Sequence, residues 1–122
     1  MTARLIGATA VILLCGCHAT SNRNGKLAAG GDPRRGAAAI VRYGCGSCHT
    51  IRGIANARAL VGPPLTGLRD RVYIAGTLPN TPANLIRWIR DPKNVNPATA
   101  MPRLPLHPVD AVDIAAYIYS IP

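Results

Sequence analysis

Two cysteines and a histidine in one short segment constrain this chain more than any other feature. Cys45 and Cys48 are three residues apart, and His49 directly follows the second cysteine. Residues three apart share a face of a helical turn. Both thiols can therefore bond to one flat cofactor, and the neighbouring imidazole can ligate a metal at its centre. The Cys-x-x-Cys-His pattern is typical of covalent haem attachment, and it predicts one haem c held by Cys45 and Cys48 and ligated by His49.

The same cysteine pair has two other interpretations, a zinc site and a redox-active dithiol. A structural zinc site takes four ligands, usually in compact pairs, and no second such pair follows His49 in the sequence. A thioredoxin-like dithiol belongs to an alternation of strands and helices, and no such alternation is visible. Haem attachment is therefore the preferred interpretation.

The composition agrees with a chain that folds around a cofactor. The 122 residues include no Phe, one Trp and four Tyr, while 12 Gly and 11 Pro indicate long loops. A domain of this length buries a modest fraction of its surface, and few aromatic side chains are available for its core. A haem would fill the middle of such a core.

The chain is strongly basic. Its net charge is +9, from 14 Lys and Arg against 5 acidic residues. A basic surface can attract nucleic acid, anionic membranes or acidic proteins. Because the charges are scattered and a haem motif is present, we expect acidic redox proteins as partners and no nucleic acid. A role in solubility alone remains open. The candidate docking residues are Arg52, Arg58, Arg87, Arg90, Lys93 and Arg103.

The first residues have the features of a bacterial lipoprotein signal peptide, predicted over 1–16. Arg4 gives a positive start, and the apolar run that follows would be about 15 Å long as a helix. The hydrocarbon core of a bilayer is about 30 Å thick, so this run is too short to span it. Its length fits the apolar region of a signal peptide. Cys17 would become the lipidated first residue, although an ordinary secretory signal with incidental cysteines is the alternative. The polar residues 17–31 are expected to form a flexible tether, and residues 32–122 the folded domain. These features predict a location on the periplasmic side of the bacterial cell envelope, with a lipid anchor in a membrane.

The rest of the chain predicts an all-α fold. One helix is expected from an Asp32 cap to about residue 43, and a second from a Thr81 cap to residue 90. A third is expected from about residue 108, with Asp110 and Asp113 favourable to the positive end of its dipole. Residues 51–67 and 92–108 are expected to be loops, with a short turn of helix at 69–73. No strand pattern is visible.

With these residues in view, the chain resembles the class I cytochromes c over residues 32–121. The segments that carry the resemblance are 62–68, with a Gly-Pro-x-Leu-x-Gly-Leu pattern, 85–101, which ends in Pro-x-Thr-x-Met, and 114–118. Residues 78–85 are most similar to the cytochrome c domain fused to subunit II of some haem–copper oxidases. The resemblance implies three to five helices and long loops wrapped around one covalent haem. It also implies that Ile114 and Tyr117 pack across Gly36 and Ile40.

The resemblance further implies roles for residues around the haem. Pro63 would accept a hydrogen bond from the ring of His49, and Trp88 would pack beside the methionine ligand. Arg71 and Thr99 would lie near the haem propionates. Met101 would be the sixth ligand of the iron.

Met101 is a candidate ligand of the iron even when the family resemblance is left aside. Met1 and Met101 are the two methionines of the chain, and Met1 would be lost with the signal peptide. An ordinary packing role for Met101 is the alternative, and His107 is the other candidate ligand.

An iron ligated by His49 and Met101 has both axial positions filled. The expected function is outer-sphere transfer of single electrons between respiratory-chain partners, toward a terminal oxidase or reductase, by a carrier that is not an enzyme. Two alternatives stay open. One is a haem enzyme or gas-binding sensor with a dissociable methionine, and the other is a fixed haem subunit of a dehydrogenase or oxidase complex.

Overall fold

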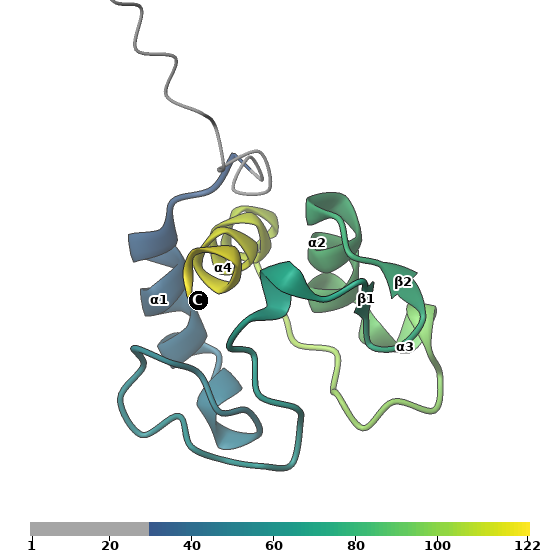
Figure 1. Cartoon of the computed structure of the whole chain (residues 1–122), viewed down its shortest axis with the longest axis horizontal. Helices are drawn as coiled ribbons and strands as arrows, with labels where there is room; N and C mark the ends of the chain where they lie inside the picture. The colour runs from purple at the N-terminus through teal and green to yellow at the C-terminus, as the bar shows by residue number, and fades with distance from the viewer. Residues whose placement is uncertain (1–29) are drawn as a thin grey trace, which may run out of the picture.

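The structure, a computed structural model, describes residues 30–122, and within them four α-helices surround a buried core (Figure 1). The helices are α1 (Pro33–Arg42), α2 (Pro82–Arg90), α3 (Pro92–Val95) and α4 (Pro108–Ser120). Long loops join them, with single 3-10 turns at Cys45–Ser47 and Leu68–Asp70. Figure 1 shows α4 (yellow) between α1 (blue) and α2 (green). The predicted all-α class is confirmed. The predicted signal peptide, the lipidation of Cys17 and residues 17–29 of the predicted tether lie outside the described residues.

Local capping explains where the two predicted helices begin. The Asp32 carboxylate accepts a hydrogen bond from the backbone N–H of Arg34 at 2.8 Å, and the Thr81 hydroxyl accepts one from Asn84 at 3.2 Å. A proline follows each cap, where its missing N–H costs nothing. Both helix starts are therefore as predicted.

Two elements were not expected from the sequence. The helix α3 occupies part of the predicted loop, and Asp91 caps it by accepting from the backbone N–H of Asn94 at 3.3 Å. A two-residue hairpin, β1 (Tyr73–Ile74) with β2 (Leu78–Pro79), lies where no strand was predicted. Both elements are too short to produce a hydrophobic period, which is why pattern reasoning misses them.

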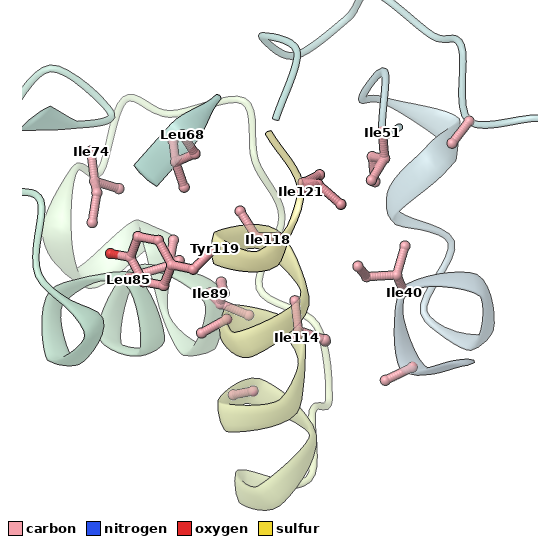
Figure 2. Packing of buried hydrophobic residues seen from close by; sticks show 14 residues of the cluster. Ile40, Ile51, Leu68, Ile74, Leu85, Ile89, Ile114, Ile118, Tyr119 and Ile121 are labelled. Atoms are coloured by element: carbon pink, nitrogen blue, oxygen red, sulfur yellow. The ribbon is translucent and has the colours of Figure 1, made fainter. Parts of the chain in front are cut away.

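The helices α1 and α4 meet at Gly36, where there is no room for a side chain. A Cβ there would lie 2.6 Å from the carbonyl carbon of Asp113 and 2.9 Å from the Cβ of Tyr117. Ile40 and Ile114 are both fully buried beside this crossing (Figure 2). The predicted packing of these two helices is confirmed.

Asp113 has a structural role that the sequence did not predict. Its side chain is 1% exposed and accepts hydrogen bonds from the Arg35 Nε at 2.7 Å and Nη2 at 3.0 Å. It also accepts from the backbone N–H of Asp32 at 2.7 Å. The hydrogen bonds from Arg35 hold the pKa of Asp113 below its ordinary value. Asp113 therefore ties the start of α1 to α4, in addition to any effect on the helix dipole.

The other side of α4 is tied to the hairpin loop. Tyr119 is fully buried among the apolar side chains of the core (Figure 2). Its hydroxyl donates to the side-chain oxygen of Asn80 at 2.6 Å. The Asn80 amide in turn donates to the backbone carbonyls of Leu68 and Arg71 at 2.6 and 2.7 Å. Burial raises the pKa of Tyr119 to about 12. A single polar network thus holds the middle of the chain against α4.

Across residues 30–122, no helix combines the length and the apolar character that crossing a bilayer requires.

Candidate functional site

A largely apolar cavity of about 390 Å³ lies between the helices and the long loops. Ile40, Leu85 and Ile118 contribute apolar walls from α1, α2 and α4. All of the predicted haem-site residues line this one cavity, namely Cys45, Cys48, His49, Pro63, Arg71, Trp88, Thr99 and Met101. Segments far apart in the sequence therefore meet around a space of the size that small-molecule sites occupy.

The cysteine motif lies on one tight turn. Gly44 lies between α1 and the motif and has a left-handed φ of 70°, which glycine adopts without strain. The 3-10 turn begins at the next residue, Cys45. The backbone N–H of His49 donates to the carbonyl of Cys45 at 3.0 Å, which brings the ends of the motif together. No disulfide joins the two cysteines. Both also line the cavity, so the turn presents both sulfur-bearing residues to the same space.

The environment of Cys45 does not suit a redox-active dithiol. Burial raises the pKa of its thiol, whereas reactive cysteines have a lowered pKa. Within residues 30–122, no three His, Cys, Asp or Glu side chains form a group that could hold a metal ion. Neither alternative interpretation of the motif therefore gains support from the described residues.

The ring of His49 is fixed on both sides. Its Nδ1 lies 2.7 Å from the carbonyl oxygen of Pro63. A Cβ on Gly62 would lie 2.7 Å from the same Nδ1 and 2.9 Å from Nε2, so only glycine fits there. The backbone N–H of Gly62 also donates to the carbonyl of Cys48 at 2.7 Å. Because a carbonyl can only accept, Nδ1 carries the proton and Nε2 keeps a lone pair suited to a metal.

Gly62 is the functional residue that sequence reasoning missed. Its position in the Gly-Pro pair of residues 62–63 was noted only as part of a motif. Its close approach to the His49 ring depends on the folded loop. A glycine directly before a proline that contacts a ligand is the signal that could have found it.

The segment around Met101 forms another wall of the cavity. Met101 is half-buried, and its backbone N–H donates to the Thr99 hydroxyl at 3.2 Å. The ammonium of Lys93 donates to the backbone carbonyls of Pro97 and Thr99. These bonds hold the loop that carries Met101. His107, the other candidate ligand, is absent from the cavity lining and lies at the start of α4.

Arg71 braces the loop that carries Pro63. Its Nη2 donates to the carbonyls of Pro64 at 2.6 Å and Thr66 at 3.3 Å. Arg71 also lines the cavity, and its other N–H groups remain for a ligand. The sequence had pointed only to a contact with the cofactor.

The residues around the cavity fit a haem. Two cysteines line it, a histidine offers an oriented Nε2, and apolar side chains predominate in its walls. A flat apolar macrocycle needs such walls, since burying it removes a large apolar surface from water. A methionine sulfur and a histidine nitrogen together form a ligand pair used for haem iron.

Comparison with known proteins gives the same answer. The sequence model of the cytochrome c family matches residues 33–122. The chain is 36% identical over 78 residues to cytochrome c oxidase subunit 2 of Alkalihalophilus pseudofirmus, covering 63% of this chain and 22% of that protein. It is 35% identical over 65 residues to cytochrome c oxidase subunit 2 of Bacillus sp. PS3, covering 52% and 18%. The match thus spans about a fifth of the length of these relatives.

Among solved structures, cytochrome c2 from Rhodobacter sphaeroides has a similar fold. It superposes with a TM-score of 0.56 at 22% identity, covering 75% of this chain and 96% of that protein. The likeness to a class I cytochrome confirms the predicted fold, and the family match implies the predicted cofactor. The chain belongs to the cytochrome c family, with the class I fold and one covalently bound haem c.

Proposed function

We propose that this chain is an electron carrier. It passes single electrons between respiratory partners, delivers them toward a terminal oxidase and transforms no substrate itself. The oxidase is suggested by the relatives, since both are named as subunit 2 of cytochrome c oxidase.

The observation that carries the proposal is the contact between His49 Nδ1 and the carbonyl oxygen of Pro63, at 2.7 Å. It fixes the tautomer that leaves Nε2 free to ligate iron. Met101 lines the same cavity, and we infer that its sulfur would be the second protein ligand of the iron. Cys45 and Cys48 would form the thioether bonds that make loss of the cofactor impossible without breaking a covalent bond.

When bound, the haem supplies an iron that gains and loses one electron. His49 and Met101 would hold the iron as its two protein ligands, which would leave no open coordination position for a substrate. The thioether of Met101 favours the reduced state relative to a second histidine and so raises the reduction potential. Arg71 and Thr99 would hold the propionates, and Trp88 would pack beside Met101. These residues keep the site dry and fixed, so little rearrangement accompanies electron transfer.

Substituting Met101 tests this assignment. Met101→Ala removes the sulfur, and we expect a lower reduction potential and new binding of carbon monoxide to the reduced protein. Leu104→Ala is the matched control, because Leu104 lines the same cavity and carries no ligand atom. It should leave the iron closed to carbon monoxide. An unchanged potential in Met101→Ala would exclude Met101 as a ligand. Ready carbon monoxide binding by the unsubstituted protein would instead favour a gas-binding sensor or enzyme.

A mobile carrier and a fixed subunit differ in what they purify with. Extraction of the native membranes in mild detergent should release a mobile carrier free of the oxidase at moderate salt. Retention of the chain in stoichiometric amount on the purified oxidase, at the same salt, would identify it as a fixed subunit.

We further propose that the chain acts at the periplasmic side of the bacterial envelope, attached by lipid at Cys17. The support is the sequence of residues 1–17, with its short apolar run and the cysteine that follows. Two or more acyl chains would give stable membrane attachment. Cys17→Ala should move the haem-loaded protein from the membrane fraction to the soluble periplasmic fraction. Unchanged membrane association in that variant would exclude lipid at Cys17 as the anchor.

A further inference from the structure

A second groove, of about 470 Å³, lies beside the cofactor cavity. Leu104 and Leu106 line both spaces, so the segment 104–106 is a wall shared between them. Together with Ile86 of α2, these half-buried side chains form the apolar floor of the groove. Three exposed arginines line its rim, and we call this feature the arginine groove: Arg87, Arg90 and Arg103.

The arginine groove has more positive than negative charge. Asp91 is the one acidic residue that lines it, and its carboxylate lies 3.7 Å from the Nε of Arg103. Asp91 also caps α3 through the backbone N–H of Asn94. Among residues 30–122, neither Arg87 nor Arg90 has an ion-pair partner. The groove therefore has two uncompensated guanidinium groups above an apolar floor.

We propose that the arginine groove docks an acidic segment of a partner protein, in which carboxylates flank an apolar side chain. Guanidinium groups bind carboxylates through two parallel hydrogen bonds, and two carboxylates would balance Arg87 and Arg90. The apolar side chain between them would cover Ile86, Leu104 and Leu106. The groove is concave, and it suits a protruding segment of a protein better than the flat array of headgroups that a bilayer presents.

The position of the groove suggests why a partner would use it. The shared wall at 104–106 follows closely after Met101 in the chain, so a docked segment lies beside the cofactor cavity. This docking role rests on the proposed electron-carrier function for its purpose, but binding itself requires no electron transfer. Because the contact is mainly electrostatic at an exposed rim, its affinity should fall as salt rises.

A short acidic peptide can test the groove by NMR in the haem-loaded protein, reduced under carbon monoxide, because the iron is then diamagnetic whether a protein ligand or carbon monoxide fills its sixth position. The probe is the blocked pentapeptide Asp-Glu-Leu-Glu-Asp, with Asn-Gln-Leu-Gln-Asn as the uncharged comparison. We expect the acidic peptide to shift the amide signals of residues 86–91 and 103–106, and the uncharged peptide to shift none of them. The double variant Arg87→Gln/Arg90→Gln should bind the acidic peptide at least tenfold more weakly.

The matched control is Arg52→Gln/Arg58→Gln, which removes the same charge from two other exposed arginines. It should weaken binding less than twofold. Equal loss in both double variants would mean general charge attraction and would overturn the proposal. So would shifts centred on other residues. A separate experiment adds vesicles of phosphatidylglycerol and follows the same amide signals. If they bind the groove residues and the peptide does not, the groove is a membrane contact and the protein-docking proposal is wrong. None of these outcomes depends on the ligands of the iron, so the proposed function is tested separately.

Discussion

Gly36 provides the most direct test of how the two terminal helices pack. We consider Gly36→Ala, a change that would stabilise an isolated helix by about 1 kcal/mol. In this fold the new Cβ would lie 2.6 Å from the carbonyl carbon of Asp113 and 2.9 Å from the Cβ of Tyr117. Ordinary contacts between such atoms are about 3.5–4.0 Å. The helices α1 and α4 would therefore have to separate by about 1 Å.

Overpacking of a well-packed contact costs about 1–3 kcal/mol. The clash at Gly36 involves backbone atoms of α4, which cannot rotate away, so we take a cost of about 3 kcal/mol at the upper end of that range. After the gain in helix propensity, the net destabilisation is about 2 kcal/mol. For a domain of this size, that lowers the melting temperature by about 10 °C.

Denaturant unfolding of the haem-loaded protein, followed by far-UV circular dichroism, measures this change. Ala38→Gly on the exposed side of α1 is the companion variant. It reports the helix-propensity term alone, which is about 1 kcal/mol, so that the packing term at Gly36 can be separated. A Gly36→Ala protein as stable as the unsubstituted one, or more stable, would refute the close approach of the helices.

Three further predictions follow from single contacts. Gly62→Ala should displace the His49 ring, since a Cβ there would lie 2.7 Å from Nδ1, and the absorption spectrum should change; an unaltered spectrum would contradict the fixed ring. The pKa of Asp113 is held down by hydrogen bonds from Arg35, so the folded state binds this proton less readily than the unfolded state. The resulting stability is present above the ordinary carboxyl pKa and is lost as the pH falls toward the lower folded value. Asp113→Asn should therefore flatten the acid side of the stability–pH curve, and an unchanged curve would exclude this linkage. Thr81→Ala removes the cap of α2 and should cost about 1 kcal/mol, while Thr81→Ser should retain most of the stability; equal losses in both would show that the cap is not the cause.

The sequence was most informative where structure is decided locally. A capping residue followed by proline marks both Asp32 and Thr81, and both helices begin there. The same signal exists at Asp91 before α3, but a helix of four residues has no period to support it. The hairpin at β1 and β2 is similar, because its two-residue strands are too short to show alternation.

Two polar contacts between distant residues were not predicted from the sequence. Asp113 appears at a helical position compatible with a surface location, and only the fold brings Arg35 to it. Asn80 likewise joins Tyr119 to the hairpin loop through hydrogen bonds that no local pattern predicts. A polar residue is buried at low cost only when its partners are in place, and those partners come from other elements.

The residues of the site were found from motifs, and the structure adds how they are held. The resemblance implied that Pro63 faces His49, and the two lie at hydrogen-bonding distance. The close approach of Gly62 to the His49 ring depends on backbone positions. So does the hydrogen bond from Arg71 to the carbonyl of Pro64. Motifs name residue types at fixed spacing, whereas these contacts depend on how a loop closes on itself.

The optical spectrum of the purified protein tests the central claim most directly. The ferric protein should show a weak far-red band from charge transfer between the Met101 sulfur and the iron. The reduced protein should show no change on addition of carbon monoxide. Both results are expected if His49 and Met101 fill the axial positions. Absence of the band together with a ready carbon monoxide shift would contradict the account, because the sixth position would then be open to ligands.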